Sequence, residues 1–307
     1  MESTLLHLAG GFADIFNVEC ILMITFGTFL GIVVGALPGL TATTGVSIFL
    51  PMTFFMPPVP GIGFLLGIYC GGMYGGSISA ILINTPGTPA GAATSLDGFP
   101  LAQKGQARKA LDMALYASVI SGLISVALLI CISPKLAKLA ISFGPSEYFA
   151  LGVFGLAIVA SLASGNVCKG ILAACIGLYL SFIGLDPING MPRLSFGTIA
   201  LQNGVSLIPA LIGLFAVSEM LLQAENAFRP VVEEKLRVTG RPLSFKELRS
   251  SLVTIVKGSL IGSFIGAVPA TGGAVAAFTS YNEAKRSSKQ KDEFGKGALD
   301  GVAASES

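Results

Sequence analysis

The chain has 307 residues, of which 52% are hydrophobic and 12% are charged, about half the charged fraction of an ordinary soluble domain. Nineteen lysines and arginines against seventeen aspartates and glutamates leave a net charge of +2, which excludes the strongly basic surface of a nucleic-acid-binding protein. The single histidine, His7, argues against histidine-based catalysis and against a histidine-ligated metal site.

The first long element is an uncharged segment near the N-terminus. No Asp, Glu, Lys, Arg or His occurs between Glu19 and Asp97, and because one bilayer crossing needs about 20 apolar residues, the segment has room for about three. It shows neither the polar face of a soluble helix nor the alternation of a membrane β-strand. The sequence therefore predicts an all-α integral membrane protein, built as a polytopic helical bundle.

We expect about eight membrane spans along the chain. They lie near residues 19–37, 41–57, 61–83, 110–133, 147–164, 169–185, 199–222 and 251–270. The hydrophilic connection at 223–250 is rich in lysine and arginine, so the positive-inside rule places it in the cytoplasm. Counting back through the spans puts the basic residues of 104–109 on the same side and those of 135–138, with Arg193, on the other side.

A nine-residue pattern occurs twice. Residues 31–39, GIVVGALPG, return as residues 262–270, GSFIGAVPA, with both glycines, the alanine and the proline identical. About seven predicted crossings separate the copies, so they would enter the membrane from opposite sides, as in the inverted repeats of many secondary transporters. The alternative is chance recurrence of a GxxxG-like packing pattern in a glycine-rich chain, and the shared alanine and proline favour the repeat. We accordingly treat 1–307 as one transmembrane domain, incomplete at its C-terminus, with a first repeat at 19–133 and the beginning of a second at 251–307.

Each copy predicts a broken, re-entrant helix. Proline ends a helix, and the backbone groups left unpaired at membrane depth persist only where protein, water or a ligand satisfies them. In transporters such breaks line substrate and ion sites. The candidate binding residues therefore follow each proline: Pro38, Gly39, Thr41, Thr43 and Thr44 in the first copy, and Pro269, Thr271, Gly272 and Gly273 in the second.

A second unusual stretch follows the third predicted span. It combines amide and hydroxyl side chains with turn-forming residues, and its candidate binding residues are Asn84, Thr85, Pro86, Gly87 and Thr88. Two prolines prevent a simple helix here. The stretch is either a turn after a span or a hairpin that lines a substrate site.

Several blocks of the sequence closely resemble the TctA family, the large membrane subunit of bacterial tripartite tricarboxylate transporters. These blocks are residues 35–41, 74–89, 97–100, 294–297 and 301–307. The resemblance covers essentially the whole chain, although Ala270 stands where the family often has glycine. Family members are considerably longer, so the chain looks like an N-terminal fragment that stops inside the last block.

The resemblance implies a permease of the bacterial inner membrane that has no cofactor. Its partners would be a small four-helix membrane subunit and a periplasmic solute-binding protein that delivers a citrate-like tri- or dicarboxylate. Coupling to Na⁺ or H⁺ is also implied. Only this resemblance makes Glu306 a residue of interest.

The charge distribution constrains how such a permease would hold an anion. No Lys or Arg lies within 20–96 or 258–282, so we expect backbone amides and threonine hydroxyls, with Asn84, to contact the carboxylates beside a bound Na⁺. Glu219 is the best candidate for a cation-linked carboxylate, whereas Asp97, Glu147 and Asp186 are expected at solvated span ends. A passive anion channel and a non-transporting assembly subunit stay open as alternatives. An intramembrane enzyme is disfavoured because the uncharged windows contain no aspartate pair and no histidine.

Overall fold

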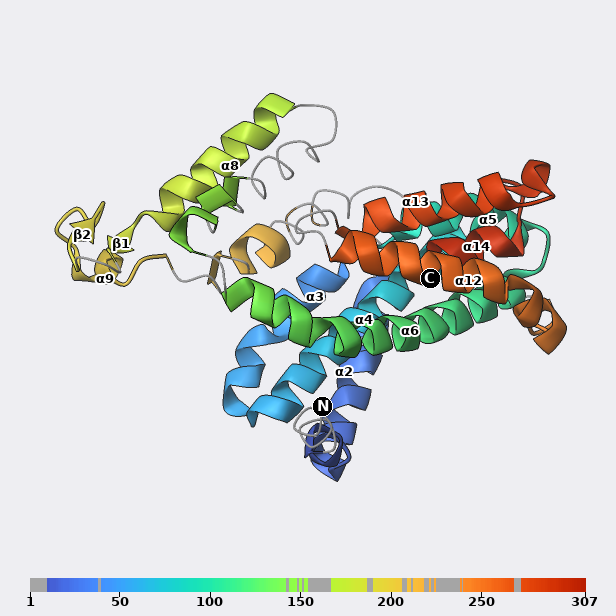
Figure 1. Ribbon diagram of the computed structural model, residues 1–307, viewed down its shortest axis with the longest axis horizontal. Helices are drawn as coiled ribbons and strands as arrows, with labels where there is room; N and C mark the ends of the chain where they lie inside the picture. The colour runs from blue at the N-terminus through green and yellow to red at the C-terminus, as the bar shows by residue number, and fades with distance from the viewer. Residues whose placement is uncertain are drawn as a thin grey trace.

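The computed structural model is almost entirely helical where it describes the chain (Figure 1). The described residues are 10–37, 40–141, 144–147, 149–150, 152–153, 167–186, 190–205, 209–210, 212–217, 221, 224, 238, 240–267 and 272–307.

The described helical elements of the N-terminal half follow the helical residues 10–15. They are α2 (Val18–Ala36), α3 (Ala42–Phe49), the 3₁₀ helix η1 (Leu50–Phe55), α4 (Pro58–Ile83), α5 (Gly91–Gln103) and α6 (Ala107–Ile141).

The remaining described elements include two short strands and several short helices. They are α8 (Val167–Ser181), the antiparallel strands β1 (Gly184–Leu185) and β2 (Pro192–Arg193), α9 (Ile199–Gln202), the π-helix η2 (Ile212–Val217), α12 (Phe245–Gly266), α13 (Gly272–Ser287), the 3₁₀ helix η3 (Lys291–Glu293) and α14 (Leu299–Ser305).

Four of the described helices are long and apolar enough to cross a membrane. They are α2, α4, the Ala107–Ser133 part of α6, and α12, and they coincide with four of the predicted spans. In place of a single span at 41–57, residues 42–55 form the shorter α3 and η1. The expected span at 147–164 lies largely outside the described residues. The described residues of the expected span at 199–222 include the short α9 and η2.

Glycines bring α2 and α4 into backbone contact. An added Cβ at Gly31 would overlap the carbonyl oxygen of Ile68, and one at Gly35 would overlap that of Gly72. The paired residue numbers rise together, so the two helices run parallel. Between them, α3 and η1 run back along α4: Ala42 lies beside Gly72 and Thr53 beside Gly61.

A second packed region joins helices from both ends of the chain. Ile81 of α4, Leu101 of α5, Met113 of α6, Ile255 of α12 and Val302 of α14 form one buried apolar cluster. In Figure 1, α5, α12, α13 and α14 gather around the first half of α6, whose second half runs toward α8. From α5, Leu101 belongs to this cluster and Ala102 packs against it.

Basic segments collect at one end of the bundle. The Lys109 ammonium lies 2.9 Å from the Glu247 carboxylate, which also pairs with Arg241 at 3.0 Å. Lys104 donates to the carbonyl oxygen of Lys296 at 2.6 Å. The loops at 104–109, 241–247 and 288–298 therefore share one end, while the β1–β2 hairpin lies at the other side of the molecule in Figure 1.

Candidate functional site

Both copies of the repeated pattern end a helix, as the sequence predicts. In the first copy α2 ends at Ala36 and α3 begins at Ala42. In the second copy α12 ends at Gly266 and α13 begins at Gly272. The candidate residues Pro38, Gly39, Pro269 and Thr271 lie outside the described residues, and the inverted orientation of the two copies stays a prediction.

The helices that follow the two breaks approach α4 at adjacent residues. A Cβ added at Gly72 would lie 2.9 Å from the Cα atom of Ala42, the first residue of α3. A Cβ added at Gly273, the second residue of α13, would lie 3.9 Å from the methyl group of Met73. The starts of α3 and α13, far apart in the sequence, thus lie against neighbouring residues of α4, α13 through the Met73 side chain.

The threonines of the first copy serve mainly local structure. Thr41 is the N-cap of α3: its hydroxyl accepts the N–H of Thr44 at 3.1 Å and lies 2.9 Å from the Thr44 hydroxyl. Capping of this kind satisfies a helix N–H that would otherwise lack a partner. The Thr43 side chain is exposed, and the backbone carbonyl of Thr43 accepts the Ser47 hydroxyl at 2.9 Å.

The stretch 84–88 folds back onto α4 and touches the first repeat. Asn84 ends α4 in the left-handed conformation, with φ 54°, which asparagine tolerates better than most residues. Gly87 donates to the Gly76 carbonyl at 3.4 Å, and an added Cβ there would overlap the Gly35 carbonyl. Asn84, Thr85 and Pro86 are exposed, whereas Gly87 and Thr88 are buried.

A cavity of about 440 Å³, lined by apolar groups and by several hydroxyls, lies next to Met73 of α4 and Gly273 of α13. Its walls come from α4, α6, α12, α13 and residues 88–91 and 305–307, and they include both Thr88 and Gly273 from the predicted set. Hydroxyl groups dominate the polar lining: Ser77, Thr88, Ser118, Ser121, Ser125 and Ser259. None of the residues that line it is a lysine or arginine, in agreement with the charge-free windows of the sequence.

Glu306 is the acidic residue of this cavity. Its Oε1 atom accepts the Ser77 hydroxyl at 2.6 Å and the Thr94 hydroxyl, and its Oε2 atom accepts the Ser118 hydroxyl at 3.2 Å. Only family resemblance pointed to Glu306 in the sequence. The one local feature that could have drawn attention to it is the run of small residues 303–305 before it, since small side chains are typical of tight helix packing. Glu219, which we had favoured, lies outside the described residues.

Asp97 is not at a solvated span end, contrary to our expectation. It is 0% exposed. Its Oδ1 atom accepts the backbone N–H groups of Gly295, Gly297 and Ala298, each at 2.8 Å, and its Oδ2 atom accepts the Tyr281 hydroxyl at 2.9 Å. Backbone amides are available here because the chain turns sharply between η3 and α14, and this network offsets the cost of burying a charge.

The Asp97 network fastens α5 to the entry of α14. Burial, together with the adjacent carboxylate, raises the pKa of the Tyr281 phenol above its usual range, so this hydroxyl stays protonated and donates. An added Cβ at Gly301 would overlap the Asp97 side chain, so the close fit needs a glycine there. The sequence blocks 97–100 and 294–297 are therefore one structural unit, which fixes the helix that leads to Glu306.

Asp186 is also buried, and it pairs with Arg193 at 2.8 Å.

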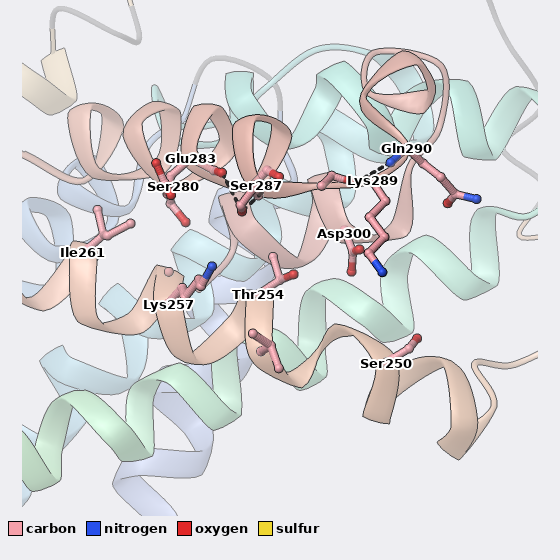
Figure 2. A pocket seen from close by; sticks show the side chains of 14 residues that line it. Ser250, Thr254, Lys257, Ile261, Ser280, Glu283, Ser287, Lys289, Gln290 and Asp300 are labelled. Carbon is pink, nitrogen blue, oxygen red and sulfur yellow. Dashed lines mark hydrogen bonds between the residues drawn. The ribbon is translucent and has the colours of Figure 1, made fainter.

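A larger space of about 720 Å³ opens between α12 and α13. Figure 2 shows Thr254 and Lys257 of α12 on one side of it, with Ser280 and Glu283 of α13 on the other. The Ser280 hydroxyl is buried and has no hydrogen-bond partner within the described part of the chain. Because both signs of charge line this space, it has no clear preference for an anion or a cation.

Comparison with known proteins identifies the family. The model of the tripartite tricarboxylate transporter TctA family matches residues 21–307. Over all 307 residues the chain is 38% identical to a protein of Agrobacterium vitis described as an uncharacterized 52.8 kDa protein in the TAR-I ttuC' 3' region, and it spans 61% of that protein's length. No solved structure matches the chain. The matched region contains both repeat copies, the 84–88 turn and the Asp97 network, and the chain belongs to the tripartite tricarboxylate transporter TctA family.

Proposed function

We propose that the complete protein is the permease subunit of a binding-protein-dependent secondary transporter for citrate-like tri- or dicarboxylates. It would lie in the bacterial inner membrane and be driven by a gradient of Na⁺ or H⁺. Family membership supports a membrane component of a tripartite tricarboxylate transporter. The chain spans 61% of its curated relative, so substrate, coupling and partners are proposed for the whole protein.

The observation that carries the proposal is that α3 and α13, the helices that follow the two breaks, start against neighbouring residues of α4, beside a cavity with several hydroxyl groups in its lining. Helix ends at membrane depth leave backbone amides and carbonyls that favour a polar ligand. When the two ends belong to different repeats, a ligand bound between them contacts both. Movement of one repeat against the other would then expose the ligand to alternate sides of the membrane.

The charge of the cavity supports coupling to a cation. A citrate-like substrate carries several negative charges, and moving each one inward against a membrane potential of 100 mV costs about 2.3 kcal/mol. The lining offers no lysine or arginine to offset that charge. Cotransported cations would lower the net charge that crosses, while backbone amides and hydroxyls bind the carboxylates.

The proposed partners follow from the tripartite plan of the family. A small membrane subunit would contact the permease within the bilayer, where the exposed apolar side chains Phe29, Leu123 and Phe264 are 62%, 69% and 70% accessible. A periplasmic solute-binding protein would deliver the carboxylate. Neither the proposed substrate nor its movement calls for chemical conversion by the permease.

Reconstitution tests this function directly. Vesicles containing the full-length permease and its small subunit, supplied with the binding protein, should accumulate labelled citrate or a related carboxylate under an imposed cation gradient. Accumulation should stop when the gradient is collapsed. Persistent equilibration without any gradient would instead indicate a channel and overturn the proposal.

A matched pair of variants links uptake to the cavity. Gly273→Leu places a large side chain beside Met73 and should strongly reduce uptake. Gly177→Leu changes a glycine of α8 that has no neighbour within 4 Å of an added Cβ, and it should leave uptake near the wild-type rate. Equal uptake by both variants would contradict a role for the α13 entry in the site.

A further inference from the structure

The Glu306 carboxylate lies where four helices meet, each contributing one hydroxyl. Ser77 belongs to α4, Thr94 to α5, Ser118 to α6 and Ser305 to α14. Three of these hydroxyls donate to the carboxylate, and the Thr94 hydroxyl also lies 3.1 Å from that of Ser305. The local ligands are thus all oxygen atoms on rotatable side chains.

The carboxylate has no cationic partner in the described part of the chain. None of the ion pairs there includes Glu306. A carboxylate held among membrane-spanning helices is costly unless a positive charge or hydrogen bonds compensate it. The hydroxyl donors supply part of that compensation, and a bound cation would supply the rest.

Hydroxyl groups can respond to a bound cation. Each carries one hydrogen and two lone pairs and rotates freely. With the site empty, the hydroxyls of Ser77, Thr94 and Ser118 point their hydrogens at the carboxylate. With a cation present, the same oxygens can turn lone pairs toward it, so one cluster satisfies Glu306 in both states.

The donor set selects the kind of cation. One carboxylate with neutral hydroxyls gives a single negative charge, whereas divalent cations are usually held by several carboxylates or by carboxylates with phosphate. Within the described residues no group of three His, Cys, Asp or Glu is placed to hold a metal ion. Oxygen ligands without nitrogen or sulfur suit a small hard cation.

We propose that Glu306, with the hydroxyls of Ser77, Thr94, Ser118 and Ser305, forms a Na⁺ site. Glu306, Ser77 and Ser118 line the same cavity as Thr88 and Gly273, so the cation would lie close to the proposed anion. Its role as coupling ion rests on the transport function proposed above. The hydrogen bonds of Asp97 hold α5 and the start of α14 together, and these two helices carry Thr94 and Ser305 of the proposed site.

Binding of radioactive Na⁺ to the purified full-length permease tests the site without substrate or partners. The wild type should bind Na⁺ saturably, and Glu306→Gln should weaken the affinity by about tenfold or more, since contacts with a charged group are among the strongest polar interactions. Glu293→Gln removes an exposed carboxylate outside the site and should bind like the wild type. Unchanged binding by Glu306→Gln, or absence of saturable Na⁺ binding in the wild type, would overturn the proposal.

A pair of serine variants keeps the test valid if Glu306→Gln does not fold. Ser118→Ala removes a hydroxyl that contacts Glu306 and should lower Na⁺ affinity severalfold. Ser125→Ala removes a hydroxyl of the same helix and cavity that pairs with Ser263 at 2.8 Å instead, and it should leave the affinity unchanged. Equal affinity of the two variants would count against the site.

Carboxylate uptake separates this proposal from the function on which it rests. Glu306-dependent Na⁺ binding in a protein that accumulates no carboxylate would support the site and refute the transport function. Uptake driven by a proton gradient alone, with no Na⁺ binding, would retain transport and refute the Na⁺ site.

Discussion

Removing the Asp97 carboxylate should release the loop between η3 and α14. Asp97→Ala leaves three backbone N–H groups and the Tyr281 hydroxyl without their acceptor. The substitution creates little steric conflict, because alanine is smaller than aspartate. Its main effect is therefore on polar groups that folding has removed from water.

The magnitude follows from which donors can reach water. The Ala298 N–H and the Tyr281 hydroxyl are buried, whereas the N–H groups of Gly295 and Gly297 are partly accessible. An unsatisfied buried donor costs about 1–3 kcal/mol, so the total loss should be about 3–6 kcal/mol. Asp97→Asn keeps an acceptor but loses the charge, and it should cost about 2 kcal/mol.

Thermal unfolding of the purified full-length protein measures the effect, and limited proteolysis locates it. The melting temperature should be lowest for Asp97→Ala, higher for Asp97→Asn and highest of the three for Tyr281→Phe. Tyr281→Phe removes a single hydrogen bond and should cost about 1 kcal/mol. New cleavage should occur within 288–298 in the alanine variant.

An exposed neighbour provides the control. Asp292 lies on η3 with its side chain in solvent, so Asp292→Ala should melt with the wild type. If Asp97→Ala also melted with the wild type and resisted protease, the carboxylate would not hold the loop, and our assignment of Asp97 would be wrong.

Two further predictions concern packing and orientation. Gly31→Ala should destabilise the α2–α4 pair by about 2 kcal/mol, because the new methyl group overlaps the Ile68 carbonyl. The control Gly177→Ala places its methyl group in open space and should not destabilise the protein. Thermal unfolding measures the difference. In a cysteine-free background, Phe196→Cys should react with a membrane-impermeant maleimide added outside. Lys246→Cys should react only after the membrane is permeabilised. The reverse pattern would contradict the positive-inside assignment.

The long spans could be predicted because their signal is local. α2, α4, α6 and α12 each contain an apolar run that spans a bilayer by length alone. The segment at 41–57 is also apolar, but Pro51 interrupts it, Pro57 ends it, and the helix after Pro38 begins only at Ala42. Proline positions therefore decide local breaks that average hydropathy does not reveal.

The two important carboxylates could not be predicted in this way. Asp97 follows an uncharged run and resembles an ordinary span end, and its burial depends on the amides of residues 295–298. Glu306 depends in the same manner on hydroxyls of α4, α5 and α6. Contacts across so much of the chain leave no periodic trace in a single sequence.

The threonines after Pro38 have local partners. Hydroxyl groups near a helix break suggest ligand contacts, and this stays a prediction; in the structure Thr41 caps α3 by accepting the Thr44 N–H, its hydroxyl lies 2.9 Å from that of Thr44, and Thr43 is exposed. Serine and threonine at a helix start commonly satisfy the local backbone first. Thr88, whose hydroxyl accepts the Gly91 N–H at 3.1 Å, does both: it caps a turn and lines the cavity.

The same chemical group is used differently at Asp97 and Glu306 because its donors differ. Backbone N–H groups around Asp97 are fixed by the chain and offer no lone pair, so they can stabilise a carboxylate but cannot join it in holding a cation. The hydroxyls around Glu306 rotate, so they can donate to the empty carboxylate or coordinate beside it. A fixed carboxylate therefore anchors α14, and an adaptable one at the end of that helix faces the cavity. In a protein with so little charge, this division gives Asp97 to the fold and leaves Glu306 available to the proposed Na⁺.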